Sequence, residues 1–288
     1  MTITRKLREL LAHQPLVVAP GAYDGLTARL VEQAGFAAVY MTGAGTAAAH
    51  GFPDYGLLTG TEMADNAGMM AASTNLPVIA DADTGYGNEL NVTRTVRDFE
   101  RRGVAAIHIE DQVAPKRCGH LDGKTVTSLE EFASKISAAV AARRDPDFMI
   151  IARTDARAVT GFEDAIVRAR AAMAAGADIA FVEAVETLEE LAMVPERVGG
   201  PCLFNVVPGG KTPKITFEDA RTMGYRLAIC PGVLLRVIVP AADAALRKLR
   251  ETGLPVSEKA EVAVTESFRR FGANEWDVLR REHAGSTT

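Results

Sequence analysis

The chain has 288 residues, of which 48% are hydrophobic, and its 32 Lys and Arg against 37 Asp and Glu give a net charge of −5. This mildly acidic balance gives no reason to expect a nucleic-acid partner. No apolar run reaches the ~18 residues of a transmembrane helix, the N-terminus lacks the apolar core of a signal peptide, and three cysteines are an odd number for a disulfide framework. We therefore expect a cytoplasmic, reducing compartment and no membrane association.

Eight short apolar runs alternate with longer amphipathic stretches, as is typical of buried parallel strands separated by helices. The predicted strands are residues 16–19, 38–41, 78–80, 106–109, 149–152, 180–182, 202–204 and 227–230.

Asp24 is placed to cap the first predicted helix, and Gly35 is placed to end it. We expect Leu26, Leu30 and Ala34 to form its apolar face.

Later helices follow in order. One opens at Thr61-Glu62, and one runs over 88–103 with an apolar face of Leu90, Val92, Val96 and Phe99. A third begins with a capping box at Ser128 and Glu131. The remaining helices are predicted to begin near residues 162, 187, 217 and 232.

Eight strand–helix units predict a (β/α)8 TIM barrel, as a single domain over residues 1–288. The alternatives are an open doubly wound sheet or two smaller α/β domains. No Pro/Ser-rich linker separates two halves, and no G-x-G-x-x-G follows the first strand.

Almost every predicted strand is followed at once by a polar or special residue. These residues are Thr42-Gly43, Asp81-Ala82-Asp83, Glu110-Asp111, Arg153-Thr154-Asp155, Glu183, Asn205 and Pro231. In a barrel they share the rim where active sites lie.

Asp81, Asp83 and Glu110 would crowd together at this rim, and Asp54 in the loop after the second strand could join them. Carboxylates that close together cannot all stay ionised without a bound cation or added protons. Oxygen ligands suit Mg²⁺ or Mn²⁺ better than zinc. The alternative is that these acids cap helices or pair with basic residues.

Arg153 is the one cation at a predicted strand end, and its guanidinium suits a substrate carboxylate. A structural salt bridge to Glu183 or Glu110 is the alternative, and the two interpretations are compatible.

The segment Lys116-Arg117-Cys118-Gly119-His120 lies in a long polar stretch that has the composition of a mobile lid. Its cationic neighbours are expected to favour the Cys118 thiolate. Cys202 and Cys230 fall in strand runs and are expected to be inert core residues.

Together these residues resemble the isocitrate lyase/phosphoenolpyruvate mutase superfamily, over about residues 17–247. The resemblance is carried by Tyr40-Met41-Thr42-Gly43, Asp81-Ala82-Asp83-Thr84-Gly85-Tyr86-Gly87, His108-Ile109-Glu110-Asp111-Gln112, the 116–120 lid and Ala152-Arg153-Thr154-Asp155-Ala156. The lid resembles that of the lyase branch, because mutases of the superfamily carry a different lid without this cysteine.

The resemblance implies that Asp81 and Asp83 hold Mg²⁺, with Asp54 and Glu110 contributing through water. It also implies homotetramers in which the C-terminal helical region, about 232–288, swaps between neighbouring subunits.

Further roles follow from the same resemblance. Tyr40 would be the base and Cys118 the general acid, with His120 and Arg153 also in the catalytic group. The implied substrate-binding residues are Thr42, Gly43, Ala44, Arg117, Gly119, Arg153, Glu183 and Asn205, the first three through backbone N–H groups at the keto-acid end.

The implied reaction is a retro-Claisen cleavage, in which the C2–C3 bond of a magnesium-bound 2-hydroxy dicarboxylate breaks and Cys118 protonates the leaving carbon. Isocitrate and methylisocitrate lyases hold the far carboxylate with hydroxyl residues where this chain has Val206 and Val207. An unpaired buried carboxylate is costly, and the 209–213 string resembles dimethylmalate lyase. We therefore expect a 2,3-dimethylmalate-like substrate rather than methylisocitrate. Thr42 stands where a serine is usual, which keeps the hydroxyl.

Three other functions stay open at this point. Schiff-base aldol chemistry at Lys116 or Lys211 would leave the acid cluster without a purpose. Oxaloacetate decarboxylation or hydrolysis could use the same metal site. A non-catalytic binding protein would have no use for the cluster together with Cys118.

Overall fold

The structure, a computed structural model, describes residues 1–255 and 263–284. The chain divides into two compact units, Met1–Leu234 and Leu235–Thr288. Among the described residues, no helix combines the length and apolar character needed to cross a bilayer.

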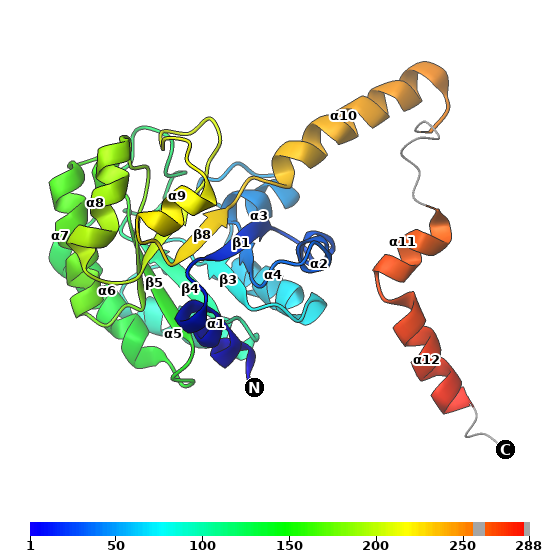
Figure 1. Cartoon of the computed structure of the whole chain (residues 1–288), viewed down its shortest axis with the longest axis horizontal. Helices are drawn as coiled ribbons and strands as arrows, with labels where there is room; N and C mark the ends of the chain where they lie inside the picture. Colours follow the sequence, from blue (N-terminus) through cyan, green and yellow to red (C-terminus); the bar gives the residue numbers. More distant parts are fainter. Residues whose placement is uncertain (256–262, 285–288) are drawn as a thin grey trace. The chain divides into compact units, whose positions relative to one another are not determined.

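The first unit is a closed barrel of eight parallel strands (Figure 1). The strands are β1 Val17–Ala22, β2 Val39–Met41, β3 Val78–Asp81, β4 Ala106–Glu110, β5 Met149–Thr154, β6 Ile179–Val182, β7 Cys202–Asn205 and β8 Leu227–Cys230. Each strand pairs with the next along the chain, and β8 pairs with β1 to close the cylinder. The predicted barrel is therefore confirmed, and the open sheet is excluded. Several strands run one or two residues further than predicted, into polar positions.

Helices follow the strands and cover the outside of the barrel. They are α2 Gly25–Gln33, α3 Gly43–Ala49, α4 Gly60–Ser73, α5 Glu89–Arg101, α6 Leu129–Ala142, η1 Ala156–Ala158, α7 Phe162–Ala174, α8 Leu188–Val198 and α9 Phe217–Thr222. One more helix, α1 Ile3–His13, precedes the barrel and was not predicted. Its buried Leu7 packs against the residues that fill the barrel interior. The second unit contains α10 Leu235–Thr252, α11 Val264–Arg270 and α12 Ala273–Ala284.

The barrel interior is built by every second residue of each strand. Its apolar members include Val17, Ala19, Tyr40, Ile79, Ala106, Ile151, Phe181, Leu203, Leu227 and Ile229. The same alternation, continued toward the carboxyl ends, carries Asp81, His108, Glu110 and Arg153 into the mouth of the barrel. The inward-facing strand positions therefore supply the apolar packing of the barrel interior and, at the carboxyl ends of the strands, the polar groups of its mouth.

The cap of the first predicted helix is confirmed. The Asp24 side chain accepts a hydrogen bond from the Thr27 N–H in a full capping box, and Gly35 has φ +84° just after the helix ends. The predicted apolar face is wrong, because Leu26 is 49% exposed and the buried positions are Thr27, Ala28 and Val31.

Two other helix predictions need correction. Leu90 is 78% exposed in the first turn of α5, whereas Val92, Val96 and Phe99 are buried as predicted. Helix α4, predicted to open at Thr61-Glu62, begins one residue earlier at Gly60, and Thr59 caps it through a reciprocal capping box with Glu62. At α6 the Ser128 side chain accepts from the Glu131 N–H, which is one of the two bonds of the predicted capping box; the reciprocal bond from the Glu131 side chain is not formed.

Candidate active site

Four acidic side chains that the sequence places after strands β2 to β4 gather at the barrel mouth. Strand register sets Asp81 beside His108, and Glu110 beside Arg153. Asp81, Asp83 and Glu110 are almost fully buried.

The lid residue Lys116 lies within the acidic cluster. Its Nζ is 3.0 Å from Asp83 Oδ1 and also bonds Asp54, and its side chain is only 4% exposed. Burial lowers the pKa of Lys116, but Asp83 and Asp81 together raise it well above its usual value. The ammonium is therefore charged and ties the lid to these acids.

The acids of the cluster differ in how easily they ionise. Burial raises the pKa of Asp83 and of Glu110 above the usual range. The pKa of Asp81 is lowered in spite of burial, because His108 and Lys116 favour its charged form. Asp81 is thus the most firmly ionised acid of the three.

Backbone strain marks the turn that presents these acids. Asp83 has φ +46°, in the left-handed region that is unusual for a residue with a side chain. Its N–H donates to Asp81 Oδ1 at 3.0 Å, which links the two carboxylates. Such strain costs about 1–3 kcal/mol and is typical of functional sites.

The donor set fits a hard divalent cation. Both carboxylate oxygens of Glu110 are buried and accept no hydrogen bond, although Arg153 Nε lies 3.2 Å from one of them. A buried acceptor without a hydrogen bond is costly unless a bound ion or water satisfies it. No group of three or more acidic, His or Cys side chains within the described ranges converges into a ready-made cage. Magnesium usually keeps several of its waters and binds through one or two carboxylates, so this cluster suits Mg²⁺ or Mn²⁺ held partly through water.

Arg153, near the end of β5, lies beside Glu110 in the mouth. Its Nε and Nη2 donate to the two oxygens of Asp155 at 2.9 and 3.1 Å. Glu110 and Glu183 lie 3.2 and 3.6 Å from it, as the salt-bridge alternative predicted. Asp155 was missed as its principal partner.

Glu183 collects contacts from both the lid and the barrel. It accepts from Asn205 Nδ2 at 2.9 Å, and His120 Nε2 lies 3.1 Å away. Burial raises the pKa of Glu183, but Arg153 and His120 outweigh it and hold that pKa below its usual value. The structure therefore brings Glu183, Asn205 and His120 together.

The lid is fixed at several points. Gln112 brackets Arg117, accepting from its N–H at 3.0 Å and donating to its carbonyl at 2.8 Å. The His120 Nδ1 accepts from the Lys211 N–H at 3.1 Å. The lid thus lies across the mouth, against the loop that follows β7.

Cys118 is partly buried in the middle of the lid. The prediction that its neighbours favour the thiolate is wrong, because burial raises the pKa of its thiol. A thiol that stays protonated at neutral pH is a proton donor rather than a nucleophile.

Tyr40 pairs with a residue that the sequence analysis overlooked. The Tyr40 hydroxyl lies 2.7 Å from His108 Nε2, which is itself 3.3 Å from Asp81 Oδ1. Burial, followed by Asp81, raises the pKa of Tyr40 well above its usual value. The signal for His108 was its position two residues before Glu110, on the same face of one strand.

The proposed keto-acid end of the site is partly occupied by the protein itself. The Thr42 N–H donates to the Ala22 carbonyl at 3.0 Å, and the Gly43 N–H donates to Asp81 Oδ2 at 3.2 Å. A side chain at position 43 would meet Asp81 Oδ2 at 2.4 Å, which explains the glycine. Thr42 caps α3, and Ala44 lies in its first turn.

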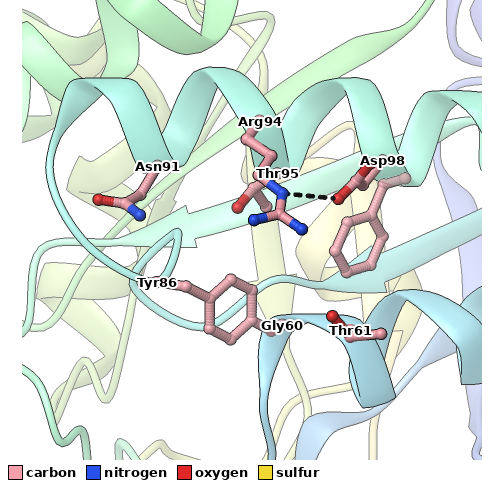
Figure 2. Close-up of a pocket in the computed structure, with 8 residues that line it drawn as sticks. Gly60, Thr61, Tyr86, Asn91, Arg94, Thr95 and Asp98 are labelled. Carbon is pink, nitrogen blue, oxygen red and sulfur yellow. Dashed lines mark ion pairs between the residues drawn. The ribbon is translucent and has the colours of Figure 1, made fainter.

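A pocket of about 140 Å³ lies outside the mouth, between the loop after β3 and the start of α4 (Figure 2). Tyr86 lines it beside Gly60, and along α5 Arg94 pairs with Asp98 at 3.5 Å. The acid cluster is not part of its lining.

The family described as phosphoenolpyruvate phosphomutase matches residues 7–250. A 2,3-dimethylmalate lyase of Eubacterium barkeri is 49% identical over 84% of this chain and 84% of its own length. A 2-methylisocitrate lyase of Aeropyrum pernix is 48% identical over 86% and 80%.

Solved structures of similar enzymes have the same fold as this chain. A 2,3-dimethylmalate lyase crystal structure matches with a TM-score of 0.94 at 43% identity, covering 100% of this chain and 97% of the other. An oxaloacetate acetylhydrolase bound to 3,3-difluorooxalacetate also has a TM-score of 0.94, at 40% identity, covering 100% and 99%.

Proposed function

The chain belongs to the phosphoenolpyruvate mutase/isocitrate lyase family and is a carbon–carbon lyase, and from this premise we propose that it cleaves a 2,3-dimethylmalate-like acid into pyruvate and propionate. The observation that carries the proposal is the position of the Cys118 lid. It is joined to the acid cluster through Lys116 and to the Arg153 side of the mouth through His120 and Glu183.

We propose Mg²⁺ as the cofactor, with Mn²⁺ as a possible substitute. Asp81 and Asp83 would hold it, and Asp54 and Glu110 would contribute through water. The bound ion would stabilise the carboxylate and developing alkoxide of the substrate and would favour the phenolate form of Tyr40.

Arg153 would orient one substrate carboxylate. Its bonds to Asp155 use Nε and Nη2, so Nη1 would be the group that donates to the substrate carboxylate. Asn205, Glu183, Arg117 and Gly119, with the Ala44 backbone, would complete the binding surface. The N–H groups of Thr42 and Gly43 already donate to Ala22 and Asp81.

The Tyr40 hydroxyl would pass its own proton to His108 Nε2, 2.7 Å away, as it takes the proton of the 2-hydroxyl group. The C2–C3 bond then breaks, C2 becomes the ketone of pyruvate, and the electron pair stays on C3. Cys118 would donate its proton to C3, which gives propionate, with His120 beside the same lid.

The preference among substrates rests on the loop after β7. Val206 and Val207 are partly buried and have no side-chain donor for a second distant carboxylate, which favours a methyl group at that end. The alternative 2-methylisocitrate would give pyruvate and succinate. Oxaloacetate hydrolysis or decarboxylation is a second alternative, supported by the likeness to an oxaloacetate acetylhydrolase.

A substrate panel would test the choice. We expect kcat/KM for 2,3-dimethylmalate to exceed that for 2-methylisocitrate and oxaloacetate, with pyruvate production measured in the presence of Mg²⁺. EDTA should abolish turnover, and added Mg²⁺ should restore it. A higher kcat/KM for 2-methylisocitrate would reverse the proposed specificity.

A cysteine variant tests the chemistry itself. Cys118→Ser should lose about 100-fold or more in kcat, as expected for removal of a general acid, while pyruvate and Mn²⁺ still bind. Cys230→Ser serves as the matched control, because Cys230 lies at the end of β8 and has no role in the proposal.

We further propose a homotetramer in which the region about 232–288 is exchanged between subunits. Of this region, residues 256–262 and 285–288 lie outside the described part of the chain. The need for a free Cys118 thiol favours a reducing, cytoplasmic compartment.

A further inference from the structure

Lys124 lies just after the lid, and its side chain is only 1% exposed. Its Nζ is 3.2 Å from Asp155 Oδ1 and also donates to the Gly119 carbonyl. A buried ammonium is costly unless its charge and its donors are matched. Lys124 therefore links the lid backbone at Gly119 to Asp155, which follows β5.

The barrel end of this connection is rigid. Asp155 is fully buried, and its carboxylate is held by two bonds from Arg153. Its own N–H donates to Asp111 Oδ1 at 2.8 Å. These three hydrogen bonds hold Asp155 in place as the ion-pair partner of Lys124.

At Gly119 the lid backbone packs closely against residues of the barrel mouth. A Cβ built on Gly119 would lie 2.5 Å from Arg153 Nη2 and 2.5 Å from Glu183 Cγ. The lid backbone therefore rests directly on the residues proposed to bind the substrate carboxylate. Cys118 is the preceding residue, so its position depends on where this backbone is held.

We propose that Lys124 is a positioning residue, which holds the lid backbone at Gly119 against Asp155 and so fixes Cys118 over the reacting carbon. The inference rests on the proposed general-acid role of Cys118. Lys124 touches neither substrate nor metal in this account, and it acts through the Gly119 carbonyl.

The contacts of Lys124 predict that its replacement lowers kcat more than it changes KM. Without the ammonium, the Arg153–Asp155 pair persists and the substrate carboxylate still binds, but the lid loses its anchor beside Cys118. A charge-assisted hydrogen bond of this kind is expected to change kcat by about tenfold or more. We expect KM to stay within about threefold, because binding groups are retained.

The experiment compares Lys124→Met with the wild-type enzyme in the presence of Mg²⁺ and pyruvate. Three quantities are measured: steady-state kcat, steady-state KM, and the rate of Cys118 alkylation by iodoacetamide, which is followed by peptide mass mapping. We expect kcat to fall and Cys118 alkylation to become about tenfold faster, with little change in melting temperature. Unchanged kcat and unchanged protection of Cys118 in a folded variant would overturn the proposal.

Asp122→Asn is the matched control. Asp122 lies two residues beyond the lid and pairs with Lys211 at 2.7 Å, but its side chain is 91% exposed. It should leave kcat and Cys118 protection unchanged; equal effects of the two variants would contradict a specific role for Lys124.

A second variant guards against misfolding. Lys124→Gln keeps a donor for the Gly119 carbonyl but removes the charge, so it should show a smaller change of the same sign. Failure of both variants to fold would assign Lys124 to stability alone and overturn the proposal. Normal turnover by Cys118→Ser, with faster alkylation of Cys118 in Lys124→Met, would remove the acid role and leave the lid anchor standing.

Discussion

At the scale of single residues, the Cys118 thiol can be probed without any substrate. Burial raises its pKa, and only the thiolate is alkylated rapidly. The alkylation rate at pH 7 should therefore be low, and it should rise with pH through a midpoint above the ~8.5 of a free cysteine. A pH–rate profile for iodoacetamide, with a short peptide of the lid sequence as control, measures it. A midpoint below that of the peptide would contradict the expectation.

Glu110 and Glu183 allow a comparison of how two buried carboxylates of the site affect thermal stability. Both are fully buried carboxylates, but Glu110 accepts no hydrogen bond, whereas Glu183 accepts from Asn205 and from the Ala184 N–H. Glu110→Gln should leave the metal-free melting temperature equal or higher, because the buried Glu110 oxygens accept no hydrogen bond and burial already raises the pKa of this carboxyl, so a neutral amide replaces it at little cost. It should also reduce the stabilisation given by Mg²⁺.

Glu183→Gln should instead lower the melting temperature, because it weakens a satisfied network by about 1–3 kcal/mol. Thermal melts of both variants with and without Mg²⁺ make the comparison. If the two variants lost equal stability in the metal-free state, the missing hydrogen bonds of Glu110 would not be a source of instability.

At the scale of secondary-structure elements, the start of α4 offers a sharp test. Thr59 makes the reciprocal capping box with Glu62, whereas the sequence analysis placed the start at Thr61. Thr59→Ala should cost about 1 kcal/mol. Thr61→Ala, an exposed position in the first turn, should cost much less. Chemical denaturation of the two variants decides which threonine caps the helix.

Strands were predictable because burial on both faces leaves continuous apolar runs, and their polar ends marked the rim. Helix α1 was missed because it precedes the strand–helix repeat, and α3 because its alanines and glycines carry no apolar period. Leu26 and Leu90 were misplaced because a leucine near a helix start fits more than one face.

Contacts between distant segments explain most of what was missed in the site. Lys124 and Asp155, or Lys116 and Asp83, are brought together by barrel closure and lid folding, and no local pattern encodes these pairs. His108 was within reach, since the two-residue period of β4 puts it on the same face as Glu110.

At the scale of the whole molecule, the C-terminal unit carries large exposed apolar side chains. Leu246, Phe268 and Trp276 are 64%, 65% and 70% exposed. If the region is exchanged between subunits as proposed, these residues are covered in the assembly. Trp276→Ser should then weaken subunit association by about 2 kcal/mol or more per buried site.

Sedimentation equilibrium at several protein concentrations measures this effect. Asp277→Ser, at the next residue of the same helix, is the control and should leave the assembly intact. A monomeric wild-type protein would contradict the proposed tetramer directly.

Lys116 gives the acid cluster a positive charge of its own, carried on the lid rather than by a bound ion. The repulsion among Asp54, Asp83 and their neighbours is therefore partly offset even when no divalent ion is present. If the site binds magnesium as proposed, we therefore expect chelation to remove activity before it unfolds the barrel, and re-addition of the ion to the same protein sample to restore turnover.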